Sequence, residues 1–168
     1  MKKVVFIFAL MLSTVVANAQ GMFDKLEDLD DVSAVVVTKD AFDLLRKFPD
    51  AQSKDMKVFN TAKGLKELKV FSTENMSIAS DMEKMVNSAI KSGKMTQLVR
   101  VKDKGNRVKI YIKASKNKDI VNEVLMFVKS NKSIKNDEKP SSTVISLLGE
   151  INMNELAEIA NDYEKKSK

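Results

Sequence analysis

The stretch that decides the fold is Thr96–Lys113, with the sequence TQLVRVKDKGNRVKIYIK. On both sides of its middle, β-branched residues alternate with charged residues or tyrosine, the period expected of a strand with one buried and one solvated face. The middle, Asp103-Lys104-Gly105-Asn106, contains the glycine and asparagine that tolerate positive φ in a tight turn. The sequence therefore predicts a β-hairpin. Its expected buried face consists of Val99, Val101, Val108, Ile110 and Ile112, and its expected solvated face of Arg100, Lys102, Lys109, Tyr111 and Lys113.

Residues 1–19 have the three zones of a secretory signal peptide. Met1-Lys2-Lys3 is charged, residues 4–16 are apolar, and Ala17-Asn18-Ala19 supplies small residues at the expected cleavage site. A membrane-spanning helix needs about 20 apolar residues, so we expect cleavage after Ala19, with retention as an anchor as the alternative. The mature chain would begin at Gln20, contain no further transmembrane segment, and be periplasmic or secreted.

Residues 20–168 are predicted to form one domain, because a chain of this length buries enough surface to fold without metals or cross-links. The sequence has no cysteine, so disulfides cannot contribute. Its 29 Lys and Arg residues fall to 27 once Lys2 and Lys3 are removed, against 23 Asp and Glu, which leaves a net charge of +4. This excess is mild and lysine dominates it, so we do not expect nucleic-acid binding.

Apolar periodicity and capping residues predict the other elements. The run 33–38 is uncharged and β-branched, which is typical of a central strand buried on both faces. A short amphipathic helix or an ordered arm is expected over 21–31. Further strands are expected over 65–73 and 143–151. A first helix is expected over 39–48 with Ala41, Leu44, Leu45 and Phe48 inward, and a second over 80–93 after the capping box Ser80-Asp81-Met82-Glu83. A last helix is expected from Asn152 or Asn154 with Leu156, Ile159, Ala160 and Tyr163 inward.

Residues 118–129 fit a helix by spacing, but the uninterrupted apolar run Val124–Val128 fits a buried strand, which we favour. A strand here can lie antiparallel to the one over 143–151. The expected order is then β-α-β-α-β-β-β-β-α. This order predicts an α+β fold of two layers, a mostly antiparallel sheet with helices on one face.

Several stretches resemble the secreted Bacteroidetes family catalogued as domain of unknown function 4252. These are Phe23–Leu26, Asp31–Lys39, Val99–Gly105, Val108–Lys113 and Val144–Ile151. The resemblance spans residues 22–159 and carries over no reaction and no catalytic residue. It implies an exported envelope protein, and members often encoded near extracytoplasmic-function sigma factors suggest a role in envelope stress or surface sensing.

The residue inventory restricts the chemistry. Without histidine the chain lacks the usual general base near neutral pH and the commonest zinc ligand, and without cysteine it lacks thiol nucleophiles. Its glycines form no phosphate-binding loop, and the acidic run 27–31 does not fit a calcium loop. We therefore expect no catalytic, cofactor or metal site.

Three functions remain to be compared. We favour an exported, non-enzymatic envelope domain that binds a protein or ligand. One alternative is a hydrolase using carboxylates such as Asp28 and Asp30, since two carboxylates suffice for glycoside hydrolysis. The other is a binder of anionic partners through the solvated hairpin face, Arg100, Lys102, Lys109, Tyr111 and Lys113.

Overall fold

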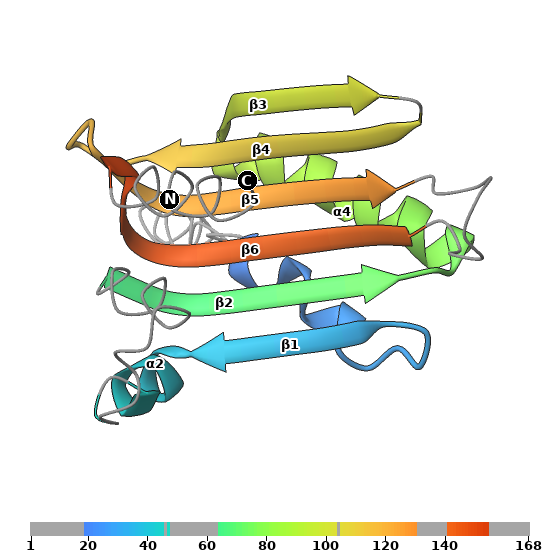
Figure 1. Ribbon diagram of the computed structural model, residues 1–168, viewed down its shortest axis with the longest axis horizontal. Coiled ribbons are helices and arrows are strands. Elements are labelled where there is room, and N and C mark those ends of the chain that lie inside the picture. The colour runs from blue at the N-terminus through green and yellow to red at the C-terminus, as the bar shows by residue number, and fades with distance from the viewer. Residues whose placement is uncertain (1–18, 46, 48–63, 104, 131–140, 155–168) are drawn as a thin grey trace, which may run out of the picture.

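The computed structural model describes residues 19–45, 47, 64–103, 105–130 and 141–154. These residues form one six-stranded antiparallel sheet in the order β1-β2-β6-β5-β4-β3 (Figure 1). The last strand, β6, lies between β2 and β5, so it joins the β1–β2 pair to the β3–β4–β5 meander. An α+β fold with an antiparallel sheet, as predicted, is confirmed.

The strands are β1 (Ser33–Thr38), β2 (Gly64–Thr73), β3 (Thr96–Asp103), β4 (Asn106–Ala114), β5 (Ile120–Ser130) and β6 (Ser141–Asn152). The helices are α2 (Lys39–Leu45) and α4 (Met76–Gly93), preceded by the 3-10 helices η2 (Ala19–Met22) and η3 (Asp24–Leu26). Residues 120–130 are a strand, which confirms the preferred reading of that segment. The expected C-terminal helix, and Phe48 of the expected first helix, lie outside the described residues.

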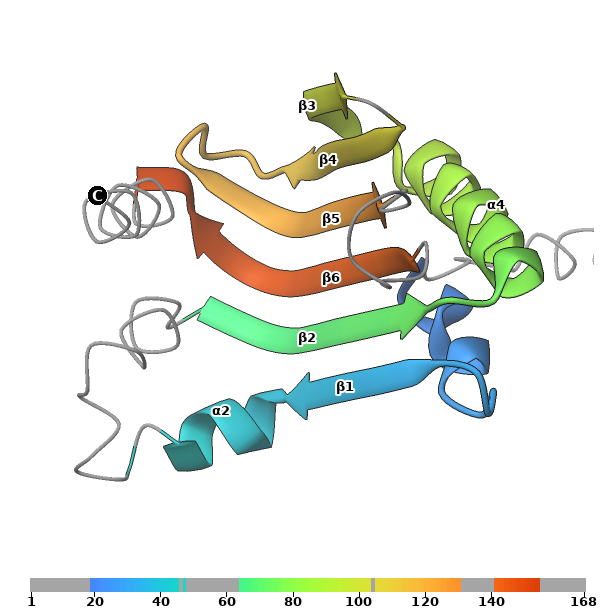
Figure 2. The same cartoon turned by 45° about the vertical axis from the view of Figure 1, so that its right-hand side comes forward.

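One face of the sheet, the helix face, packs against α4 and the N-terminal arm (Figure 2). Phe71 of β2, Val144 of β6 and Phe127 of β5 lie next to one another in the strand register and are buried. Their partners in this main core are Met82, Val86 and Ala89 of α4 and Phe23 and Leu26 of the arm. The helix predicted over 80–93 is therefore confirmed, and it buries one face against the sheet.

Helix α4 begins at Met76, four residues before the predicted capping box at Ser80. Its cap is Asn75, whose side-chain oxygen accepts hydrogen bonds from the backbone N–H groups of Ser77 and Ile78. With Asn75 capping the helix, the turn that begins at Met76 is already helical, so Ser80-Asp81-Met82-Glu83 lies inside the helix and not at its start. The prediction of the helix start was wrong.

The opposite face carries a second, smaller core near α2. Phe42 of α2 is buried there with Leu65, Val121, Val124 and Ile151. Leu44, predicted to point inward, is exposed, because the short helix turns Phe42 toward the sheet instead. The expectation of helices on one face therefore holds for α4 and not for α2.

Strand β1 is an edge strand, with β2 as its partner on one side (Figure 1). The prediction of a central strand buried on both faces was wrong, since Val35 is 55% exposed and Val36 is 39% exposed. Uncharged β-branched runs fit the pleated surface at the edge or the centre of a sheet equally well, so composition did not separate the two.

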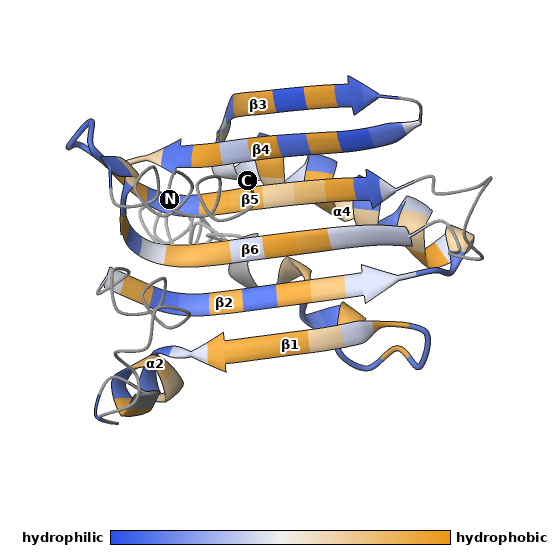
Figure 3. Cartoon of the chain, in the orientation of Figure 1, coloured by the Kyte–Doolittle hydropathy of each residue, from blue (hydrophilic) through white to orange (hydrophobic). Residues whose placement is uncertain are grey.

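The hairpin predicted over 96–113 is confirmed as β3 and β4. Its apolar face, however, is not the one that α4 covers: Val99 is 36% exposed and Val101 is 51% exposed. Figure 3 shows the alternation of polar and apolar residues along both strands. Alternation specifies two faces but does not specify which of them meets a helix.

Candidate binding surfaces

The five residues of the predicted solvated face share the helix face of the sheet, but they have different surroundings. Lys109 donates a hydrogen bond to Glu83 of α4 at 3.2 Å and its Nζ lies 5.9 Å from the ring centre of Phe127. Tyr111 donates to Gln97 at 3.3 Å and packs against the main core. Lys113 lies opposite Glu123 in the register. Arg100 and Lys102 are exposed on the edge strand.

Two further cations join Arg100 and Lys102 on the same face. In the strand register Lys102 lies opposite Arg107, and Arg107 lies opposite Lys129. We call Arg100, Lys102, Arg107 and Lys129 the basic corner. The sequence signal for Arg107 was present, because it is two residues before Lys109 on the same strand, whereas Lys129 joins the corner only through the register of β4 with β5.

A second group of charges lies inside the helix face. Lys69 of β2 is 7% exposed and donates to Asp24 of the arm at 2.6 Å, with Glu67 at 3.4 Å. Burial alone would lower the pKa of the Lys69 ammonium, but the hydrogen bond to Asp24 and the charge of Glu67 outweigh it and raise that pKa. The charged lysine therefore ties the arm to β2.

Glu123 of β5 is 5% exposed and lies on the helix face, two strands from Glu67 across Leu148. Burial raises the pKa of its carboxyl, and the charge of Lys113 opposes that rise. The folded protein thus favours the protonated form of Glu123 more than the unfolded chain does.

This raised pKa makes folding stability depend on pH. The contribution of Glu123 is most favourable below the usual pKa of glutamate and is lost as pH rises through the raised pKa of the folded state. We expect Glu123→Gln, which stays neutral, to be more stable than wild type at pH 8 and indistinguishable from it at pH 4, as measured by urea unfolding. Glu27→Gln, at an exposed site, is the control. An equal effect of Glu123→Gln at both pH values would contradict the assignment.

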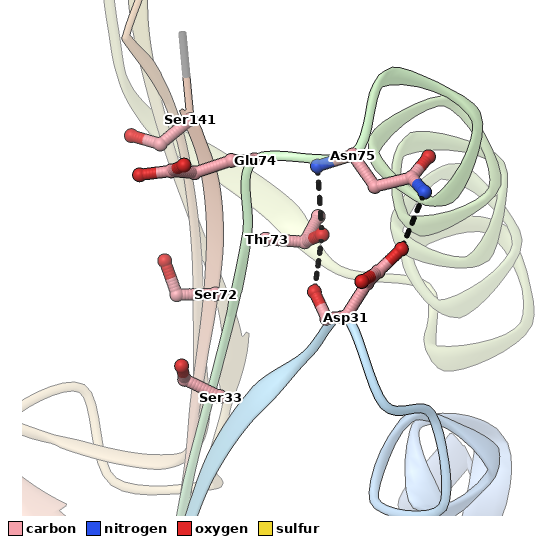
Figure 4. Close-up of a pocket in the computed structure, with 7 residues that line it drawn as sticks. All are labelled: Asp31, Ser33, Ser72, Thr73, Glu74, Asn75 and Ser141. Atoms are coloured by element: carbon pink, nitrogen blue, oxygen red, sulfur yellow. Dashed lines mark hydrogen bonds between the residues drawn. The ribbon is translucent and has the colours of Figure 1, made fainter. Parts of the chain in front are cut away.

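A polar pocket lies where β1, β2 and β6 meet the start of α4 (Figure 4). Thr73 Oγ1 donates to the Asp31 carbonyl oxygen at 2.7 Å and accepts from the Asn75 backbone N–H at 3.0 Å, while Asn75 Nδ2 donates to Asp31 Oδ2 at 2.7 Å. On the other side of β2, Ser72 and Thr143 share a hydrogen bond of 2.9 Å. The bonds among Thr73, Asn75 and Asp31 fix the turn that caps α4, and the Ser72–Thr143 bond joins β2 to β6. The hydroxyls of Ser33 and Ser141 also line the pocket and can donate to a ligand.

The opposite face carries one row of apolar residues that crosses all six strands, the apolar row. Its members are neighbours in the register: Val35, Val70, Ile145, Met126, Ile110 and Val99. Val35 and Val99 at the two ends are exposed, and the four between them are half-buried, with Ile110 packed against the second core. Figure 3 shows apolar segments at neighbouring positions of the strands. A continuous apolar surface of this kind marks an interaction site in soluble proteins.

Comparison with known families identifies the domain. A family described as "Domain of unknown function (DUF4252)" matches residues 23–159. The chain belongs to this family. The DUF4252 match begins at Phe23, the first buried residue of the arm, and includes every described strand. No curated protein and no solved structure matches the chain significantly.

The DUF4252 domain offers no group of acidic side chains arranged for a metal ion within the residues that the structure describes. Asp28 and Asp30 are both exposed in the turn after η3, and Asp31 is the member of that acidic run that lines the polar pocket. None of the helices in the described ranges is long and apolar enough to cross a bilayer.

Proposed function

We propose that this DUF4252 domain is an exported, non-enzymatic binding protein that holds a partner against the apolar row. The observation that carries the proposal is the row itself, six apolar side chains in register of which two are exposed and four half-buried. Each Å² of apolar surface that a partner covers contributes roughly 25 cal/mol of favourable free energy, so burial of the row favours association.

Export is part of this proposal and is supported by the residues before the domain. Residues 1–19 have the charged, apolar and small-residue zones of a signal peptide, and Phe23, which is buried in the main core, follows the expected cleavage site closely. We infer a periplasmic or secreted location in a bacterial envelope of the Bacteroidetes type. A role in sensing envelope stress or the cell surface would fit a domain that acts by binding.

The proposal is tested by placing a photo-activated cross-linking amino acid at Met126, in the middle of the apolar row, and producing the protein in its own cells. We expect a discrete cross-linked product in the envelope fraction. Ser80, exposed on α4 on the other side of the sheet, is the matched control position and should give none. The cross-linked protein should begin at Gln20 by mass spectrometry.

A second variant separates specific binding from chance contact. Ile145 is the register neighbour of Met126 and is half-buried, so Ile145→Lys places a charge in the row without opening a core cluster. We expect this change to remove the Met126 product while the circular dichroism spectrum stays unchanged. Equal products at Met126 and Ser80, or a product that survives Ile145→Lys, would refute the proposed binding surface. Protein confined to the cytosol with residues 1–19 intact would refute export.

A further inference from the structure

Strand β3 is the edge of the sheet at the end opposite β1, and it pairs with β4 on one side (Figure 1). Every residue of β3 is exposed. The backbone N–H and C=O groups on the outer side of an edge strand can pair with an added strand. Two separate features of β3 describe what such a strand would contain.

The first feature is the apolar side of β3. Val99 ends the apolar row, and Val101 ends a second set of apolar neighbours formed with Val108 and Val128. An added strand would place alternate side chains beside Val99 and Val101. Apolar side chains at those positions would extend both rows by one strand.

The second feature is the basic corner on the other side of β3. Like charges placed directly opposite one another destabilise a sheet, yet Lys102, Arg107 and Lys129 are in direct register. In the strand register these cations are followed by Ser142 of β6 and Thr73 of β2, so no acidic residue lies in line with them. Glu83 of α4, which faces this side of the sheet, is bonded to Lys109. Acidic side chains on an added strand would place an opposite charge beside Arg100 and Lys102.

We propose that β3 binds an extended segment of a partner protein in which apolar and acidic residues alternate. The segment forms a seventh strand, its apolar side chains beside Val99 and Val101 and its acidic side chains beside Arg100 and Lys102. Because strand side chains alternate with a period of two, the same pattern fits a parallel or an antiparallel segment. This proposal rests on the proposed binding function and names the chemistry of the partner at one end of the apolar row.

A second copy of this chain fits the β3 edge less well. Pairing β3 with β3 so that the two apolar sides stay on one face puts Arg100 and Lys102 against the same cations of the other copy. Strand β1 of another copy would bring Ser-Ala-Val-Val-Val-Thr, which has no acidic residue to place beside the basic corner. Charge complementarity therefore favours an acidic partner segment.

The test uses the purified protein and two fluorescein-labelled peptides, one alternating valine and glutamate over eight residues and one with the same composition in two blocks. Fluorescence anisotropy should show at least about tenfold tighter binding of the alternating peptide. The charge-reversed variant Arg100→Glu/Lys102→Glu should lose this preference and instead bind an alternating valine–lysine peptide. The control Lys84→Glu/Lys91→Glu makes the same charge change on the exposed side of α4 and should behave as wild type.

Several results would overturn the proposal. Equal affinity for the two peptide isomers would exclude strand addition, and unchanged affinity in the charge-reversed variant would exclude recognition by Arg100 and Lys102. A dimer in sedimentation experiments that is disrupted by the Arg100→Glu/Lys102→Glu change but not by the peptide would assign the edge to a second copy. The peptide assay does not use the Met126 cross-link. Failure of peptide binding at β3 can therefore be distinguished from failure of the binding function proposed for the apolar row.

Discussion

Gly149→Ala is expected to lower the free energy of unfolding by about 3 to 5 kcal/mol, because it combines backbone strain with a collision between strands. Gly149 of β6 has φ +138°, a conformation that other residues rarely adopt. A Cβ atom at this position would also collide with the carbonyl oxygen of Gly64 and lie 2.8 Å from the Cα of Leu65 on β2. Urea unfolding followed by circular dichroism measures the change.

Gly21→Ala is the matched control for this experiment. A Cβ atom on Gly21 would have its nearest contact at 3.5 Å, to Asp24 Oδ2, which is an ordinary van der Waals distance. The control should therefore change the stability by less than about 1 kcal/mol. If Gly149→Ala were as stable as Gly21→Ala, β2 and β6 would not approach each other closely at the irregularity between Leu65 and Glu67.

Phe71→Ala is expected to cost about 3 to 5 kcal/mol of folding stability, since it opens a cavity in the centre of the main core. Phe71 is completely buried, and its ring centre lies 6.5 Å from that of Phe23 in the arm. It also belongs to the cluster that includes Met82 and Val86 of α4. The substitution should therefore loosen the arm and α4 together, which hydrogen–deuterium exchange of both segments would detect along with the fall in stability.

Val35→Ala provides the comparison, because Val35 is on the neighbouring strand but is 55% exposed. It should cost less than about 1 kcal/mol and leave exchange in the arm and α4 unchanged. Loss of protection in α4 alone after Phe71→Ala would show that the arm does not depend on the main core.

The sequence predicted local elements correctly where the residue types present strongly favour one backbone conformation. Gly105 and Asn106 located the hairpin turn, and the run Val124–Val128 distinguished a strand from a helix. The cap of α4 was missed because Ser80 and Asn75 are both good capping residues, and only the contacts of Asn75 with Thr73 and Asp31 select it.

The candidate surfaces depended on information that a single strand does not contain. The alternation of β3 and β4 grouped Arg100 with Lys102, but the partners of Lys109 and Tyr111 come from α4, β5 and a neighbouring strand position. Long side chains such as lysine can cover a core with their stems while their charged ends reach a partner. The polar face of the hairpin is therefore the face that α4 meets, and its apolar face, which carries the end of the apolar row, is the one left partly exposed.

The place of β6 in the sheet has a consequence for how the chain is made. The strand nearest the end of the described chain is also the one that bridges the two halves, since β6 pairs with both β2 and β5. Until the ribosome has added the residues of β6, β2 has no strand to pair with on its inner side. The entropy cost of bringing β2 and β6 together over the long intervening chain is offset only when their contacts form. The growing polypeptide consequently cannot join the β1–β2 pair to the β3–β4–β5 meander until the residues of β6 have been added, so the sheet forms late relative to the synthesis of its other five strands.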